Sequence, residues 1–182
     1  MANYSARILV ILLTIVSLRV YAGDVRLLVD TASATLTVLE EGTVIQVFEG
    51  IAIGRYGTTD YKKKGDNMTP LGTYRIGWIS GNTRFHRFIG ISYPDLDSVS
   101  RAMFDGTISK ADWLRMRREI LAGKVPWQHS ALGGYLGIHG LGEGDIEVHR
   151  QYNWTNGCIA LTNEQIDRLI AWVKVGTLVE IR

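Results

Sequence analysis

Alternating apolar and polar residues run through the first part of the chain from residue 25. Residues 25–30, 34–42 and 43–54 carry Val, Ile, Leu and Thr with a period of two, and Glu41-Gly42 ends the second of these runs. A period of two is typical of strands with one buried face, and a residue pair that ends in Gly is typical of a hairpin turn. We therefore predict a half-buried antiparallel meander.

The strand pattern resumes after a glycine-rich, basic loop at residues 54–68. Pro70 and Gly72 predict a turn, because Pro sets the backbone for the first half of a turn and Gly tolerates the second half. An alternating run follows at 73–80, and an apolar run spans 85–93. Both runs are predicted to be strands.

The period then changes to that of a helix in residues 95–104 and 109–121. The second segment also opens with a capping pair. The residues that carry these patterns are Leu96, Val99 and Met103 in the first segment, and Ser109, Asp112, Trp113, Met116 and Ile120 in the second. We expect a helical hairpin with a packed stripe, and its place in the chain suggests a lid or a cleft wall.

The last third of the chain returns to short strands. One is predicted to end at His139 and another to cover residues 146–149. Thr162 opens a capping box ahead of an apolar stripe, and Gly176 is predicted to end that helix before a final strand at 177–181. The predicted fold class is one mostly β domain with α insertions, which include a helical hairpin and a C-terminal helix.

Residues 1–22 have the pattern of a cleavable signal peptide. Arg7 precedes a mainly apolar run at 8–18, and small or compact residues follow at 20–22. The run is shorter than the roughly 20 apolar residues of a permanent membrane span. We therefore expect a signal peptide at 1–22, one domain at 23–182, and export.

Removal of residues 1–22 balances the charge of the chain. The sequence has 20 Lys and Arg against 18 Asp and Glu, and two of the basic residues, Arg7 and Arg19, lie in the predicted signal peptide. Composition therefore gives no support to a nucleic-acid partner. The one basic run, at 62–64, is interpreted as a solvated loop.

The candidate chemistry is concentrated in residues 138–161, which hold the only cysteine, Cys158, and two of the four histidines. A single thiol cannot form an internal disulfide, so an exported protein that keeps one suggests a chemical role. We interpret Cys158 as the nucleophile of a cysteine-histidine acyl-transfer enzyme. An inert, buried thiol is the alternative.

His139, 19 positions before Cys158, is the preferred base. An imidazole that takes the thiol proton raises the thiolate population of a group whose ordinary pKa is near 8.5. His149 is the alternative base or a substrate contact. A metal site built from these three residues is another alternative, although the spacing has neither a C-x-x-C nor an H-x-x-x-H pattern.

The glycine before the cysteine permits a tight turn that presents peptide N–H groups to a substrate. The N–H groups of residues 156–158 are expected to stabilise a tetrahedral oxyanion, and one such donor contributes ~3 kcal/mol. Tyr135, Trp127 and Trp154 either line a groove for a peptide or pack in the core.

Two motifs resemble those of a known family. HG at 139–140 is followed by fourteen residues and then by TNGC at 155–158, which resembles the L,D-transpeptidase (YkuD-type) signature of HG, a spacer of about 14 to 17 residues, Ser or Thr, His, Gly and Cys. Residues 65–74 are similar to the GD..TP.G.Y strand lead-in of that family, and 158–161 with 176–179 are similar to its C-terminal end. The resemblance covers the predicted mature chain.

The resemblance implies an L,D-transpeptidase-like β-sandwich or mixed sheet, with a helical hairpin before the active-site segment and a C-terminal helix. It also implies a periplasmic enzyme that acts on peptidoglycan stem peptides. It implies that Cys158 attacks the carbonyl of the L-centre of diaminopimelate, that His139 is the base, and that the Gly140 carbonyl holds the ring tautomer. An amine from a second stem or from a lipoprotein lysine would complete a transpeptidation, whereas water would make the enzyme a carboxypeptidase or amidase. No cofactor or metal is implied, and a catalytically silent wall-binding module is the remaining alternative.

Two positions depart from the usual family pattern. Asn156 stands where the family usually has His, and Ala160 stands where it usually has Arg or Asn, a version that resembles a subgroup of proteobacterial periplasmic members. Backbone contributions at the turn survive such changes more readily than side-chain contacts to a substrate. The candidate oxyanion or substrate-binding residues are Asn156, Gly157, Thr155, Trp154, Tyr135 and His149.

Overall fold

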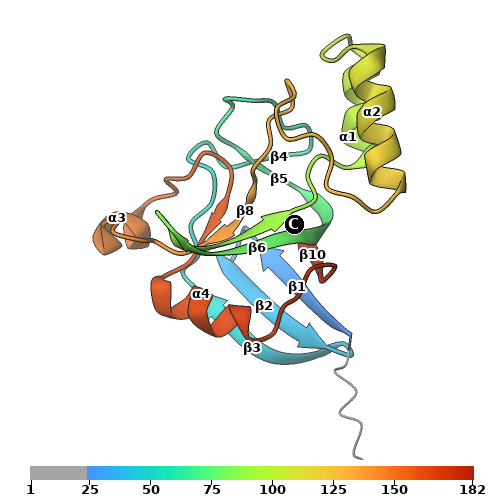
Figure 1. The fold of residues 1–182 in the computed structure, drawn as a ribbon. Helices are drawn as coiled ribbons and strands as arrows, with labels where there is room; N and C mark the ends of the chain where they lie inside the picture. Colours follow the sequence, from blue (N-terminus) through green and yellow to red (C-terminus); the bar gives the residue numbers. More distant parts are fainter. Residues whose placement is uncertain (1–23) are drawn as a thin grey trace, which may run out of the picture.

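The computed structural model describes residues 24–182, so the signal peptide predicted at 1–22 lies outside the described residues. The elements alternate short strands with four helices in this part of the chain (Figure 1). In chain order they are β1 (Val25–Asp30), β2 (Thr35–Glu40), β3 (Thr43–Glu49), β4 (Thr58–Thr59), β5 (Thr69–Pro70), β6 (Gly72–Thr83), β7 (His86–Ile91), α1 (Leu96–Phe104), α2 (Lys110–Leu121), β8 (Gly137–His139), α3 (Ile146–Gln151), β9 (Ile159–Ala160), α4 (Asn163–Ile170) and β10 (Leu178–Ile181).

Eight strands form one mixed sheet in the order β3-β2-β1-β10-β6-β7-β8-β9, and β4 pairs with β5 separately. The predicted antiparallel meander is confirmed as β1-β2-β3. Glu41 and Gly42 have φ values of 50° and 82°, as a two-residue hairpin turn with two positive φ angles requires. β10 makes the sheet mixed, because it runs parallel to β1 and antiparallel to β6.

The segment after β3 links the two edges of this sheet. The predicted strand at 43–54 is interrupted at Gly50, which has a φ of 70°. The chain then pairs with β9, where Ala52 and Ala160 exchange two backbone hydrogen bonds of 3.0 and 2.7 Å. The Arg55 N–H donates to the Thr155 carbonyl at 3.0 Å, so the same segment also holds the turn before β9.

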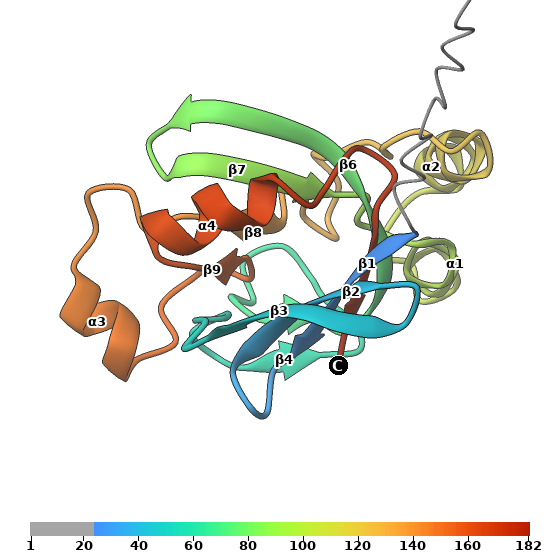
Figure 2. The same ribbon diagram turned by 90° about the horizontal axis from the view of Figure 1, so that it is seen from below.

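The helices cover the core as their apolar stripes predict. Figure 2 shows α4 lying over the part of the sheet that contains β7, β8 and β9, and Ile166 and Leu169 of α4 are fully buried. The predicted capping box at Thr162 is confirmed. The helix ends at Ile170, before the predicted end at Gly176, because the N–H groups of residues 171 and 172 bond to carbonyls three residues back, a tightening typical of a last turn.

The predicted helical hairpin is confirmed as α1 and α2, which lie side by side at one end of the molecule (Figures 1 and 2). Val99 of α1 and Met116 of α2 are fully buried, and Trp113 packs partly against the core. The Ser109 side chain accepts from the Asp112 N–H at 3.1 Å, as the capping pair predicts.

The strand predicted at 146–149 is wrong, because these residues form the first part of α3. The carboxylate of Asp145 accepts hydrogen bonds from the N–H groups of Glu147 and Val148 at 2.7 and 3.4 Å. An N-cap of this kind favours a helix start, and an apolar pattern of four residues is too short to separate a strand from a helix.

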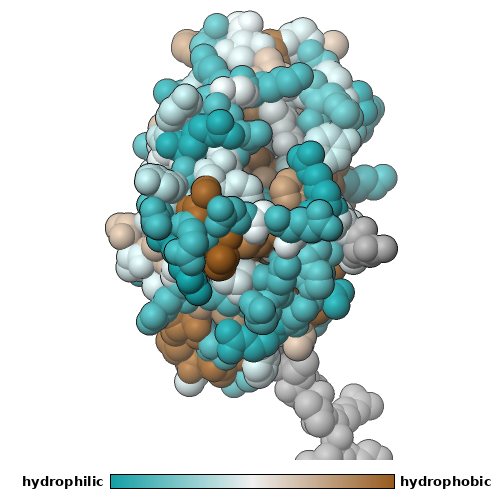
Figure 3. Space-filling view, turned by 90° about the vertical axis from the view of Figure 1, so that its left-hand side faces the viewer, coloured by the Kyte–Doolittle hydropathy of each residue, from teal (hydrophilic) through white to brown (hydrophobic). Residues whose placement is uncertain are grey.

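Hydrophilic residues cover most of the one face of the molecule that Figure 3 shows. Figure 3 shows one face of the molecule, on which hydrophobic residues gather near the middle and at the lower edge, with hydrophilic residues around them. None of the helices within residues 24–182 combines the length and the apolar character that a membrane span requires.

Candidate active site

His139 and Cys158 are placed by two neighbouring strands. His139 is the last residue of β8, and Cys158 directly precedes β9. The parallel register pairs Ile138 with Ile159, which sets Cys158 opposite Gly137. Because side chains alternate along a strand, the thiol and the imidazole emerge on the same face. Both line one cavity of about 590 Å³, within the roughly 300–1,000 Å³ that is typical of ligand sites.

The His139 ring is held by its own neighbour. Its Nδ1 lies 2.7 Å from the Gly140 carbonyl oxygen, which can only accept, so Nδ1 carries the hydrogen and Nε2 is left to take a proton. Gly140 has no room for a side chain, because a Cβ there would lie 2.7 Å from the Phe85 carbonyl oxygen.

Asn163, at the start of α4, secures the loop that follows Gly140. Its side-chain oxygen accepts from the Gly142 N–H, and its side-chain nitrogen donates to the Gly142 carbonyl, both at 2.9 Å. Sequence reasoning missed this residue, because nothing near it in the chain indicates a partner 21 positions away.

Aromatic rings surround the imidazole. Phe85 stacks on His139 with ring centroids 4.1 Å apart, Phe88 lies parallel at 6.1 Å, and Trp154 meets the ring edge to face at 5.7 Å. Burial in this apolar setting lowers the pKa of His139 to about 4, although the Gly140 carbonyl opposes the change. The ring is therefore neutral at pH 7 and available as a base.

The Cys158 thiol is neutral at pH 7 as well. Burial raises its pKa to about 11, against the opposing effects of the Gly137 backbone and the positive charges of Lys62 and Arg84. The thiol donates weakly to the Tyr135 carbonyl, 3.8 Å from the sulfur. The resting pair is thus a thiol and a neutral imidazole, so the proton has to move as the sulfur attacks.

The turn that carries Cys158 is braced by the Thr155 hydroxyl. This hydroxyl accepts from the Gly157 N–H at 3.1 Å and donates to the Cys158 carbonyl at 2.7 Å. The expectation that all three N–H groups of residues 156–158 serve an oxyanion is therefore wrong for Gly157. No acceptor for the N–H groups of Asn156 and Cys158 is found within residues 24–182, so these two are the available donors.

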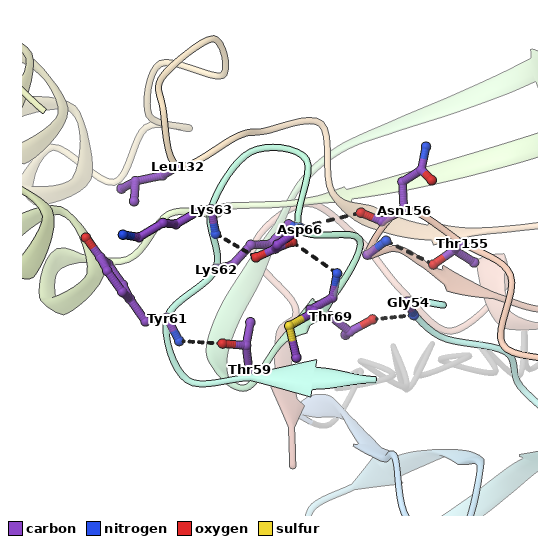
Figure 4. Close-up of polar contacts among 12 residues, drawn as sticks. Gly54, Thr59, Tyr61, Lys62, Lys63, Asp66, Thr69, Leu132, Thr155 and Asn156 are labelled. Atoms are coloured by element: carbon purple, nitrogen blue, oxygen red, sulfur yellow. Dashed lines mark hydrogen bonds and ion pairs between the residues drawn. The ribbon is translucent and has the colours of Figure 1, made fainter. Parts of the chain in front are cut away.

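A buried ion pair lies beside the turn (Figure 4). Lys62 is only 3% exposed, and its Nζ lies 2.6 Å from Asp66 Oδ1 and 3.5 Å from the Asn156 carbonyl oxygen. The interpretation of residues 62–64 as a solvated loop is wrong for Lys62 and right for the exposed Lys63 and Lys64.

The GD..TP motif brings this pair to the turn. Asp66 also accepts from the N–H groups of Lys63 and Met68 at 2.7 and 3.0 Å, and the Thr69 hydroxyl accepts from the Gly54 N–H at 2.9 Å. Only glycine fits at Gly157, because a Cβ there would lie 2.5 Å from the Met68 carbonyl oxygen and 2.9 Å from the Lys62 Nζ.

His149, Trp154 and Tyr135 take different positions. His149 is buried outside the cavity, where its Nδ1 accepts from the Trp154 Nε1 at 3.2 Å, so it braces the indole and lies away from the substrate side. Trp154 and Tyr135 line the cavity, whereas Trp127 does not and instead lies under the Arg115 guanidinium at 4.8 Å.

The helical hairpin of α1 and α2 contributes no residue to this cavity, so the suggested role as a wall of the cleft is wrong for the described conformation. Within residues 24–182, no three or more His, Cys, Asp or Glu side chains gather so as to hold a metal ion. Sequence reasoning also missed Arg55 and Arg84, which line the cavity.

Comparison with known proteins gives one family and a set of similar folds. The family model for the L,D-transpeptidase catalytic domain matches residues 24–181. No curated protein matches the chain. Among solved structures, the helical cell shape determining protein Pgp2 from Campylobacter jejuni is 22% identical, with a TM-score of 0.56 over 87% of this chain and 47% of that one.

Two further structures show the same fold at lower identity. Bd1075 from Bdellovibrio bacteriovorus is 19% identical, with a TM-score of 0.54 over 88% of this chain and 48% of that one. An L,D-transpeptidase mutant from Enterococcus faecium is 13% identical, with a TM-score of 0.51 over 87% of this chain and 50% of that one. The chain thus spans about half the length of these proteins.

Proposed function

The chain belongs to the family of L,D-transpeptidase catalytic domains, and from that premise we propose that it is an exported enzyme that forms a Cys158 thioester with peptidoglycan stem peptides. The single observation that carries the proposal is the shared cavity of Cys158 and His139, in which the imidazole is neutral and its Nε2 is left free by the Nδ1 contact to Gly140.

In the proposed acylation the thiol proton moves to His139 Nε2 while the sulfur attacks the carbonyl carbon of the L-centre of diaminopimelate. The bond to the terminal D-alanine nitrogen breaks, and His139 returns the proton to that nitrogen. Holding the thiol and the base in one cavity removes the need for a resting thiolate, which burial disfavours at Cys158.

The Cys158 N–H is the proposed donor to the oxyanion, because it has no other acceptor among the described residues. The preceding peptide unit, between Asn156 and Gly157, is held at both ends. Lys62 contacts its carbonyl oxygen and the Thr155 hydroxyl accepts from its N–H. A donor held in place before the reaction costs no reorganisation when charge develops.

The second step resolves the thioester. An amine from another stem or from a lipoprotein lysine gives a transpeptidation, and water gives a carboxypeptidase or amidase. In either case His139 takes the proton of the incoming nucleophile, the bond from the acyl carbon to the Cys158 sulfur breaks, and His139 returns the proton to that sulfur. Substrates of this kind lie outside the cytoplasm, and we propose a periplasmic enzyme whose residues 1–22 are removed during export.

The test is an assay with a labelled stem tetrapeptide in the presence and absence of an amine acceptor, read by intact mass and by product analysis. The wild-type protein should show an acyl adduct on Cys158, and its product identifies the acceptor. Cys158→Ala should show neither adduct nor product, and His139→Gln should lose about 100-fold or more in rate.

His86→Gln is the matched control, since His86 lies at the surface and pairs with Asp167. Its rate should stay close to that of the wild type. An adduct that persists in Cys158→Ala, or equal rates in the two histidine variants, refutes the assignment of nucleophile and base.

A further inference from the structure

Two arginines that line the cavity have no carboxylate partner. Neither Arg55 nor Arg84 belongs to an ion pair within residues 24–182, and no Asp or Glu lines the cavity. The charge of Lys62, which lies beside the turn, is balanced by Asp66. Two guanidinium groups at a cleft with apolar walls create a positive potential that attracts anions.

Arg55 is held by the turn that carries Cys158. Its backbone N–H donates to the Thr155 carbonyl at 3.0 Å. Its Nη2 donates to the Asn156 side-chain oxygen at 2.6 Å and reaches the Trp154 carbonyl at 3.4 Å. A guanidinium has five N–H donors, so these contacts orient the group and leave donors free for a bound anion.

The Arg55 contact gives Asn156 a role. Its amide oxygen accepts from the guanidinium, whereas the histidine usual at this position in the family resemblance has no such carbonyl oxygen. The side chain therefore positions Arg55 along the cavity, which Asn156 also lines.

Arg84 lies on the imidazole side. Its guanidinium sits over the Phe85 ring at 4.6 Å, and Phe85 in turn stacks on His139 at 4.1 Å. Its charge acts on both reacting groups, because it helps to lower the pKa of His139 and opposes the rise in the pKa of Cys158.

We propose that Arg55 and Arg84 form a carboxylate-binding subsite, in which Arg55, positioned by Asn156, binds a free carboxylate of the acyl donor and Arg84 supplies the second positive charge. The identity of the donor as a stem peptide rests on the proposed function. Such a peptide carries two free carboxylates near the scissile bond, at the terminal D-alanine and at the D-centre of diaminopimelate. The planar fork of Arg55 suits either of them.

A first test needs no peptide substrate. Cys158 is alkylated with iodoacetate, which is anionic, and with iodoacetamide, which is neutral, and the ratio of the two rates is compared between variants. Both reagents consume the same thiolate, so the ratio cancels changes in thiol reactivity. Arg55→Gln and Arg84→Gln should each lower the iodoacetate-to-iodoacetamide ratio by about threefold or more, as expected for the loss of one nearby charge.

The variants at these positions include their own controls. Arg55→Lys keeps the charge and should retain most of the ratio, while Asn156→Asp neutralises Arg55 and should lower it. Arg101→Gln is the matched control, because Arg101 is exposed and stacks on the Tyr61 ring at 4.2 Å, away from the cavity.

A second test separates the two carboxylates. Stem tetrapeptides amidated at the terminal D-alanine or at the diaminopimelate carboxyl are compared with the free acid. The amide that removes the bound carboxylate should lower kcat/KM by about tenfold or more in the wild type, as expected for a lost hydrogen bond to a charged group. The same amidation should lower kcat/KM by a smaller factor in Arg55→Gln than in the wild type.

The outcomes distinguish the two proposals. If Cys158 is alkylated but its rate ratio is the same in Arg55→Gln and in Arg101→Gln, or if neither amidation reduces kcat/KM, the carboxylate subsite is refuted while the proposed function stands. If the stem peptide forms no adduct on Cys158 although the ratio responds to Arg55→Gln, the subsite stands and the proposed substrate is refuted.

Discussion

Replacement of Lys62 with Met is expected to weaken both the fold and the reactivity of Cys158. The two side chains are similar in length, but Met cannot donate to Asp66 Oδ1, which lies 2.6 Å from the Lys62 Nζ, or to the Asn156 carbonyl oxygen at 3.5 Å. The carboxylate then keeps only two backbone N–H donors. The Asn156 carbonyl, at one end of the peptide unit between Asn156 and Gly157, also loses its partner.

The magnitude follows from the burial of the pair. Removal of one partner from a fully buried ion pair costs about 3–5 kcal/mol of unfolding free energy. Asp66 is 20% exposed and retains backbone hydrogen bonds, so the loss should be smaller. We expect about 2 kcal/mol, within the range for one hydrogen bond to a charged group.

The loss should depend on pH in a defined direction. Burial alone would raise the pKa of Asp66, but the hydrogen bond from Lys62 and those from two backbone N–H groups together lower it below 3.8. A lowered carboxyl pKa stabilises the fold above the unfolded-state pKa, and the contribution is lost as pH falls through the folded-state pKa. The difference between the wild type and Lys62→Met should therefore be full above pH 3.8 and shrink below it.

The assay is urea unfolding at neutral and acidic pH, together with the rate of iodoacetamide alkylation at Cys158, which should fall in Lys62→Met. Lys64→Met is the control, because Lys64 is exposed in the same basic run. The double variant Lys62→Met/Asp66→Asn should regain most of the stability, since it removes the uncompensated charge. A Lys62→Met protein that matches Lys64→Met in both stability and alkylation rate refutes the reasoning.

Three further outcomes are expected. Because the pKa of His139 is about 4 and that of Cys158 about 11, kcat/KM for acylation should be nearly flat from about pH 5.5 to 9.5; an acid limb centred near 6.5, the ordinary histidine value, contradicts this. Thr155→Val should lose about 1–3 kcal/mol of unfolding free energy in urea, whereas Thr155→Ser keeps the hydroxyl and should retain most of it; equal losses would contradict the bracing role. Gly157→Ala, whose Cβ would meet a carbonyl oxygen at 2.5 Å with φ at 123°, should cost at least about 2 kcal/mol more by the same measurement than Gly176→Ala, where φ is 95° and space is open; similar costs would show that the turn yields.

The elements that the sequence predicted correctly depend on residues close together in the chain. The meander at β1-β2-β3 follows from alternation over a few residues and a two-residue turn, and the helix starts at Ser109 and Thr162 follow from side chains that bond three residues ahead. The wrong prediction at 146–149 also concerns a local signal. The helix there starts at the Asp145 cap, one residue before the segment, and the strand prediction did not take that cap into account.

The pairing of Cys158 with His139 in one cavity was also within reach of the sequence, because the spacing between HG at 139–140 and TNGC at 155–158 resembles the family signature. At Gly140 and Gly157, backbone atoms of other segments lie where a side chain would have to be. The glycines were visible in the sequence, but the segments that approach them were not.

Lys62 and Arg55 show what only the tertiary structure decided. In the sequence Lys62 is one of three consecutive lysines, and a run of lysines usually lies exposed to solvent. The fold instead buries Lys62 against the Asn156 carbonyl, 94 positions away. Arg55 gains its place because residues 52–55 pair with β9 and the turn before it, about 100 positions further along. The sequence by itself determined the local elements and the chemical groups at the turn, because these follow from interactions over a few residues. The charges around that turn depend on pairing between segments that meet only when the whole sheet has formed, so they became visible only in the folded chain.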